Sequence, residues 1–114
     1  FEGTSKQYRI NVQGKELQIP LRDILYFETG RHVTLIHTLT DTISITKVLS
    51  EVCEDFEQNP EFLKVGRSYL INRLYVRNVD PAEIEMMNSA VIPIPVRLQR
   101  EIRQQLKEDR FSKT

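Results

Sequence analysis

The sequence is poor in cysteine and glycine and contains no tryptophan. Its single cysteine, Cys53, cannot form a disulfide within the chain or supply the several thiolates of a structural zinc site. A lone cysteine suits a reducing compartment, so we expect a cytoplasmic protein. Because only four glycines occur, a glycine-rich phosphate-binding or dinucleotide-binding loop is excluded.

Long hydrophobic runs are absent as well. No apolar stretch approaches the length of a membrane span, and no segment has the features of a signal peptide. At 114 residues the chain is most simply one domain with a single modest core. Its first residue is Phe1 rather than methionine, so we expect a domain cut from a longer protein.

The chain also lacks a net charge, since 16 basic residues balance 16 acidic ones. This balance by itself argues against a nonspecific polyanion binder. The charges are nevertheless segregated: residues 29–40, 62–79 and 86–100 contain no acid, whereas residues 51–61 contain five acids and no base. We therefore expect a basic face, with the acidic run on the far side of the molecule.

The apolar periodicity predicts a mostly β domain. Alternation and β-branched or aromatic content favour short strands at 8–13, 17–19, 24–29, 33–40 and 41–46, and again at 62–65, 74–80, 83–87 and 90–94. Turns are expected at 14–16 and 88–90, and Pro93 and Pro95 favour an edge strand or a strand end.

Two segments have a helical period instead. The first has Thr46 as its expected N-cap and apolar positions at Val48, Leu49, Val52, Cys53 and Phe56. The second begins after Pro95, with an apolar stripe of Leu98, Ile102 and Leu106. Roughly opposite that stripe are Arg97, Arg100, Arg103 and Lys107.

No constellation of an enzyme or a metal site is found. His32 and His37 are expected on opposite faces, and no third ligand has a zinc-like spacing. Cys53 fits a small buried hydrophobe, and Glu83 with Glu85 fits a solvated face of a strand. We therefore expect no catalysis, no cofactor and no metal.

Cations lie instead at three predicted loops or element ends. Arg31 and His32 separate two strands, Arg67 and Ser68 separate two more, and Arg97 follows the last strand. Arginine suits bidentate contacts with guanine or phosphate, and serine is a short phosphate donor. The alternative, left open by composition alone, is that these are ordinary surface charges paired with acids.

Four segments resemble one known family. "DILYFET" (23–29), "VTLIHT" (33–38), "FLKVGRSYLINRLYV" (62–76) and "VIPIPVR" (91–97) follow, in this order, the pattern of the LytTR-type DNA-binding domain of LytR/AlgR-family bacterial response regulators. The resemblance covers about residues 7–108 and is most specific in "FLKVGRSYLIN". Two positions depart from it: Gly66 replaces the usual histidine, and Arg97 replaces a common serine.

The resemblance implies a fold and a function. The fold is an elongated arrangement of about ten short strands in small antiparallel sheets with two short helices. Loops then enter successive major grooves of double-stranded DNA, with His32, Arg67 and Arg97 as base readers. The implied DNA-contacting residues are Arg31, His32, Lys64, Arg67, Ser68, Asn72, Arg97 and Arg100. For Asn72, a role in capping or bracing the loop is an equal alternative.

The resemblance also implies a setting in the cell. Residues 1–114 would be a single domain in the C-terminal part of a transcriptional regulator, the output domain of a two-component system, following a receiver domain in the parent chain. It would bind direct-repeat DNA sites as a dimer. The lack of a long apolar run, and not the resemblance, is the reason to expect no membrane association. The alternative is a protein-interaction module on the same fold, whose basic loops bind an acidic partner.

Overall fold

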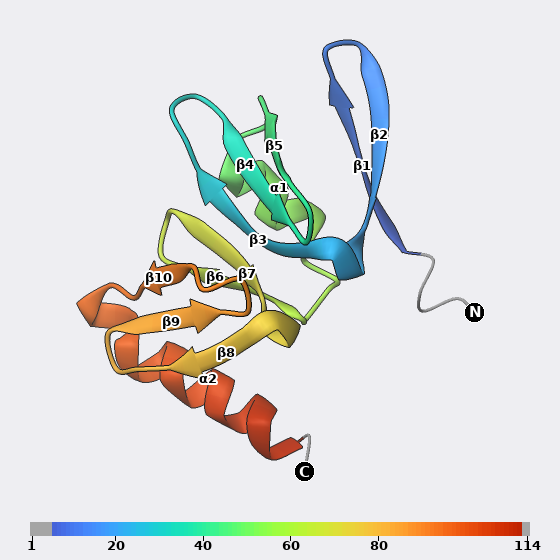
Figure 1. The fold of residues 1–114 in the computed structure, drawn as a ribbon. Coiled ribbons are helices and arrows are strands. Elements are labelled where there is room, and N and C mark those ends of the chain that lie inside the picture. Colours follow the sequence, from blue (N-terminus) through green and yellow to red (C-terminus); the bar gives the residue numbers. More distant parts are fainter. Residues whose placement is uncertain (1–5, 113–114) are drawn as a thin grey trace.

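The computed structural model describes residues 6–112, with side chains described through residue 107. It contains ten short strands in three antiparallel sheets and two α-helices (Figure 1), which confirms the mostly β prediction. The strands are β1 (Gln7–Val12), β2 (Lys15–Pro20), β3 (Ile24–Thr29), β4 (Thr34–Thr38), β5 (Thr42–Ile45), β6 (Phe62–Val65), β7 (Tyr69–Asn72), β8 (Val76–Val79), β9 (Glu83–Met86) and β10 (Val91–Pro93). The helices are α1 (Leu49–Asp55) and α2 (Gln99–Ser112), with 3-10 turns η2 (Leu21–Asp23), η3 (Arg73–Tyr75) and η4 (Val96–Leu98).

A five-stranded sheet with the order β5-β4-β3-β7-β6 is the central layer. One of its faces packs against α1 and the β1–β2 hairpin, in a cluster that includes Phe27 and Val52. The other face packs against the β10-β9-β8 sheet and α2, in a cluster that includes Ile71, Met86 and Ile102. Because side chains alternate across a strand, four-residue strands can serve both clusters.

An irregularity in β3 lets this central strand fill both clusters. Its register with β4 shifts between Ile24 and Tyr26. Ile24 and Phe27 join the α1 cluster, whereas Leu25 and Tyr26 both join the α2 cluster. Two consecutive residues on one face are what a bulge produces. Alternation in the sequence gave no sign of this shift.

The predicted β1–β2 hairpin is present, but its turn lies at Gln13–Gly14 and not at 14–16, because β2 already begins at Lys15, opposite Val12. Gln13 and Gly14 have φ values of 53° and 81°, as a tight two-residue hairpin turn requires. Asn11 closes the turn, because its Oδ1 accepts a hydrogen bond from the Gly14 N–H at 3.1 Å. Tyr8 and Ile10 are buried on the inner face, as predicted.

The prediction of Thr46 as the N-cap of α1 is wrong. The helix begins at Leu49, and Val48 holds the N-cap position with extended backbone. The Val48 N–H donates to Glu51 Oε1 at 3.4 Å, so the acid in the first turn supplies the side-chain half of the cap. The segment before the helix is bound to β4 instead, because the Lys47 carbonyl accepts a hydrogen bond from Thr34 Oγ1 at 2.6 Å.

The C-terminal elements follow their predictions closely. β10 is an edge strand of its sheet, which accommodates Pro93 because an edge strand has a free N–H side. The turn at 88–90 is present, with the Met86 N–H donating to the Ala90 carbonyl at 2.8 Å. Ile102 and Leu106 of α2 are buried in the second cluster, and Leu98 packs against it.

Candidate nucleic-acid interface

The β3–β4 loop is a tight turn that presents Arg31 and His32. The Gly30 N–H donates to the Val33 carbonyl at 2.8 Å and closes the base of the loop. Both tip residues are exposed, and His32 has a left-handed backbone with φ 64°. A closed base with an exposed tip projects these side chains outward from the sheet.

The β6–β7 loop consists of Gly66, Arg67 and Ser68 and lies beside the end of β3. The Thr29 N–H donates to the Ser68 carbonyl at 2.9 Å, and Thr29 Oγ1 donates to the Arg67 carbonyl at 3.3 Å. The backbone of this loop is therefore fixed to the strand that leads into the first loop, while the side chains of Arg67 and Ser68 remain exposed.

The third loop connects β10 to α2 and carries Arg97 in η4. The Ile94 carbonyl accepts a hydrogen bond from Gln99 Nε2 at 3.1 Å, and the Leu98 N–H donates to the Pro95 carbonyl at 2.9 Å. These bonds hold the turn closed, and Arg97 projects from it into solvent.

Gly66 joins the second loop to the third. A Cβ at this position would lie 3.0 Å from Pro95 Cγ, and the backbone has φ 67°, which favours glycine. The two loops also line a shallow groove of about 290 Å³, and beside it Val96 is 84% exposed. The departure from the family histidine thus has a local explanation, because only glycine fits this close approach without strain.

The three loops consequently lie along one edge of the molecule, on the left in Figure 1. They bring together the predicted contact residues Arg31, His32, Arg67, Ser68 and Arg97, and Arg100 follows at the start of α2. Among the described residues, no carboxylate lies within ion-pair distance of Arg31, Arg67, Arg97 or Arg100. The helix α1 packs on one face of the central sheet through Leu49 and Val52, and its acids Glu51, Glu54 and Asp55 are exposed there.

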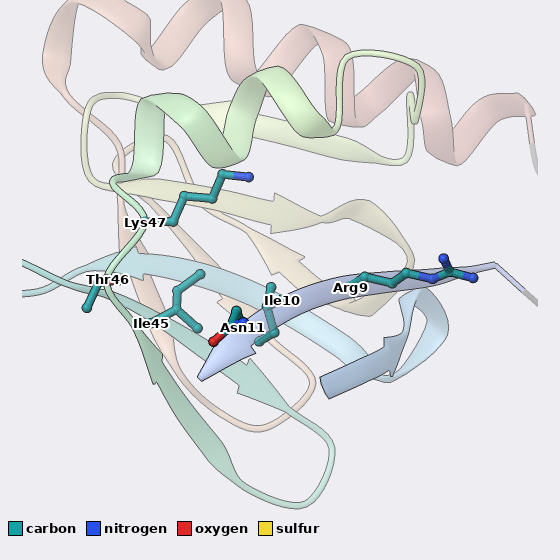
Figure 2. A pocket seen from close by; sticks show the side chains of 6 residues that line it. All are labelled: Arg9, Ile10, Asn11, Ile45, Thr46 and Lys47. Atoms are coloured by element: carbon teal, nitrogen blue, oxygen red, sulfur yellow. The ribbon is translucent and has the colours of Figure 1, made fainter. Parts of the chain in front are cut away.

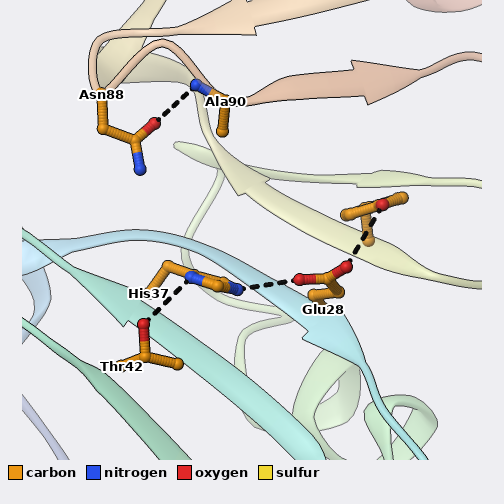
Figure 3. A network of polar contacts seen from close by, with 6 residues as sticks. Glu28, His37, Thr42, Asn88 and Ala90 are labelled. Atoms are coloured by element: carbon orange, nitrogen blue, oxygen red, sulfur yellow. Dashed lines mark hydrogen bonds and ion pairs between the residues drawn. The ribbon is translucent and has the colours of Figure 1, made fainter.

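A polar network on the face of the central sheet that packs against α2 braces the strands that lead to the loops (Figure 3). His37 Nε2 lies 2.8 Å from Glu28 Oε1, and its Nδ1 lies 3.3 Å from Thr42 Oγ1. The Tyr69 hydroxyl donates to Glu28 Oε2 at 3.4 Å, and the Tyr26 ring stacks on His37 at 4.3 Å. Burial, followed by the nearby Glu28 charge, raises the pKa of both tyrosines. Side-chain hydrogen bonds therefore connect the four strands β3, β4, β5 and β7, from which the first two loops extend.

The structure corrects the assignment of Asn72 as a DNA contact. Its side chain is 1% exposed and lies inside the fold. Nδ2 donates to the Ile24 carbonyl at 2.9 Å, and Oδ1 accepts from the Leu74 N–H at 3.0 Å. Because both polar groups are used within the protein and no solvent reaches them, Asn72 braces β7 and η3 and cannot touch a phosphate.

Lys64 lies on β6, two residues before the second loop, and projects on the α1 side of the central sheet. On β6, Phe62 belongs to the α1 cluster and Leu63 and Val65 to the α2 cluster, so Lys64 projects on the α1 side. Burial raises the pKa of the Cys53 thiol on α1, and the nearby Lys64 charge partly offsets this rise. Lys64 is exposed but shares its side of the sheet with the acidic helix.

A second hollow, of about 260 Å³, lies between β1 and β5 (Figure 2). Arg9 and Lys47 are the cations in its lining, and Figure 2 shows them apart from each other, on β1 and on the segment after β5. Lys47 Nζ lies 2.5 Å from Asp55 Oδ2, so its charge is balanced within the protein. This hollow therefore does not present converging free cations.

A metal-binding cluster and a membrane-spanning helix are both absent from the part of the chain that the structure describes. No group of three or more histidine, cysteine or acidic side chains there could hold a metal ion. Nor is any helix within it both long and apolar enough to cross a lipid bilayer. Cys53 is partly buried in the α1 packing, close to its predicted role as a small hydrophobe.

What sequence reasoning missed is the contact between loops. Thr29 and Pro95 hold the three loops together, yet the sequence does not indicate these contacts at either position. Their partners lie tens of residues away, and such pairings leave no periodic signal. Gly66 was the one residue in the sequence that could have indicated a constrained loop, since a glycine in a short strand connection favours a left-handed backbone.

The geometry defines the chain as a small β-rich binding module that presents cationic loops along one edge. The model of the LytTr DNA-binding domain family matches residues 14–107, so the chain belongs to this family. A solved LytTr DNA-binding domain has the same fold, with a TM-score of 0.74 and 17% identity over 90% of this chain and 97% of that chain. That domain comes from a Bacillus cereus protein described as a methyl-accepting/DNA response regulator. No curated protein matches this sequence.

Proposed function

We propose that this domain binds specific sites on double-stranded DNA through its three loops, which enter successive major grooves. The observation that carries the proposal is that three loops, distant in the sequence, form one edge with arginines that no described acid neutralises. Membership of a DNA-binding family supports the same partner. In this proposal, His32, Arg67 and Arg97 read base edges.

The hydrogen-bond donors around these residues would position the loops on the sugar-phosphate backbone of the DNA. Arg31, Ser68 and Arg100 are exposed next to the base-reading candidates, where they can reach phosphates. Lys64 could meet a phosphate only on the α1 side, and it is the weakest of the predicted contacts. Asn72 has no part in binding.

We further propose that the domain is the output domain of a two-component response regulator. A receiver domain would precede it in the parent chain, and pairs of domains would occupy direct-repeat sites as a dimer. The similar Bacillus cereus domain belongs to a protein described as a response regulator, which supports this setting. Sedimentation on duplexes carrying one or two half-sites tests it, since two half-sites should bind two domains.

The test of DNA reading starts from a pool of random duplexes selected by the wild-type domain over several rounds. Fluorescence anisotropy then compares the enriched duplex with wild type, Arg67→Ala and Arg97→Ala. Each substitution should weaken binding by roughly 1–3 kcal/mol and relax one part of the enriched motif, because a bidentate arginine discriminates one base pair.

Arg9→Ala is the matched control, because it removes an exposed arginine from the β1–β2 hairpin. Arg9→Ala should leave binding unchanged. If the two loop variants weakened binding equally for all sequences, the loop arginines would be assigned to phosphates only. If no duplex were enriched, DNA reading would be refuted for this domain, and an acidic protein partner would be sought.

A further inference from the structure

The helix α2 carries a stripe of exposed cations beyond the three loops. Arg100, Arg103 and Lys107 are all exposed, while Ile102 and Leu106 are buried on the opposite side. At about 100° per residue, the three cations fall within an arc of roughly 60°. Glu101 lies outside this arc, so the stripe has one sign of charge.

This stripe is unfavourable for the isolated helix. Arg100 and Arg103 are three residues apart, and Arg103 and Lys107 are four apart, so both pairs are like-charged neighbours that destabilise a helix. Arg100 is also the second residue of α2, where the positive end of the helix dipole disfavours a cation. Among the described residues, no acid forms an ion pair with any of the three. A polyanionic partner would remove all of these penalties.

The position of the stripe indicates which polyanion. Arg100 lies three residues after Arg97, and α2 starts beside the loop edge and runs away from it (Figure 1). From Arg100 to Lys107 the helix rises about 10 Å, which is about three base-pair steps along a duplex. The stripe therefore begins at the candidate interface, and its length matches a short track of phosphates.

We propose that Arg100, Arg103 and Lys107 bind phosphates of the DNA that flanks the sequence read by the loops. The inference rests on the proposed function and extends its footprint. Phosphate contacts of this kind add affinity without adding sequence preference. The domain should consequently bind a given motif more tightly when the duplex continues beyond it.

The experiment compares two duplexes, one limited to the selected motif and one extended by about ten base pairs on each side, a full helical turn. Wild type should bind the extended duplex several-fold more tightly. The double variant Arg103→Gln/Lys107→Gln should lose this difference, bind the short duplex as wild type does, and reduce the log–log salt slope on the extended duplex by about two. Arg100 stays in place, because it already belongs to the proposed interface.

Two controls separate this result from trivial causes. Arg9→Gln/Lys15→Gln removes two cations from the β1–β2 hairpin and should keep the flank dependence. Arg103→Lys/Lys107→Arg keeps both charges and should restore it. Circular dichroism verifies that every variant retains its helix.

An unchanged flank dependence in the Gln double variant would overturn the inference, as would an equal loss on both duplexes. Wild-type binding that ignores duplex length would also overturn it while leaving the proposed function intact. If wild type bound neither duplex, the proposed function itself would fail, and this inference would fail with it.

Discussion

At the residue scale, the site depends on side chains and backbones that never touch DNA. Gly66 lets the second loop pack against Pro95, and Asn72 holds β3 to η3 from inside the fold. Sequence reasoning identified Arg31, Arg67 and Arg97 from their loop positions, and the structure brings the three loops that carry them to one edge. The sequence alone could not decide the role of Asn72, because a polar residue at the end of a strand can either contact DNA or form hydrogen bonds inside the fold.

Gly66→Ala should destabilise the domain more than Gly14→Ala. Both glycines have a left-handed backbone, which costs an alanine about 1–2 kcal/mol. Only position 66 adds a close contact, with Pro95 Cγ at 3.0 Å, whereas no atom lies within 4 Å at position 14. Urea unfolding of the two variants measures the difference. Equal losses of stability would mean that the loops do not pack at this point.

Asn72→Ala should lower the free energy of unfolding by about 1–3 kcal/mol per orphaned partner, since the Ile24 carbonyl and the Leu74 N–H lose their buried partner. DNA affinity, measured where the variant is fully folded, should stay near the wild-type value. A stable variant with greatly weakened binding would restore Asn72 as a DNA contact.

Cys53 should react slowly with iodoacetamide at neutral pH. Burial raises the pKa of its thiol, so less of the reactive thiolate is present than in a free cysteine. Lys64→Gln should slow the reaction further, because the Lys64 charge lowers that pKa. The reference is an exposed cysteine made by Ser44→Cys in a Cys53→Ser background. Alkylation as fast as the reference, or no effect of Lys64→Gln, would contradict the placement of Lys64 beside α1.

At the element scale, periodicity predicted most strands and both helices, because apolar residues recur in them at the strand or helix period. The apolar stripe of α2 and the presence of the first hairpin follow directly from local residue chemistry, although its turn lies at Gln13–Gly14 and not at 14–16. The bulge in β3 and the late start of α1 did not follow. They depend on the register with β4 and on the Thr34–Lys47 bond, which involve residues distant in the sequence.

The start of α1 provides a test at this scale. Glu51→Ala should destabilise the domain by about 0.5–1 kcal/mol, because it removes the acceptor of the Val48 N–H and an acid from the first turn. Thr46→Ala should change stability by less than about 0.5 kcal/mol, as is usual for an exposed side chain without a bond to lose. Thermal unfolding of both variants decides between them. The opposite order would restore Thr46 as the N-cap.

At the scale of the whole molecule, a chain of zero net charge keeps a cationic edge by placing many acids elsewhere. The helix α1 carries Glu51, Glu54 and Asp55 on one broad face of the central sheet. This arrangement suits binding to particular DNA sites, since the molecule as a whole has no attraction for polyanions. The segregation was visible in the sequence, but the meeting of three distant loops was not.

Binding to DNA should therefore depend steeply on salt despite the zero net charge. If the edge neutralises about five phosphates, log affinity should fall against log salt with a slope near −4.5. Anisotropy at several salt concentrations gives this slope for wild type. A slope near zero would exclude a phosphate-lined interface and favour binding to a partner of another kind.

NMR titration of the 15N-labelled domain with its selected duplex tests whether these three loops form the DNA interface. Amide signals of residues 30–33, 66–68 and 95–100 should shift or broaden together, while those of the β1–β2 hairpin turn should stay unchanged. Changes confined to the hairpin or to α1, with the three loops silent, would contradict the account.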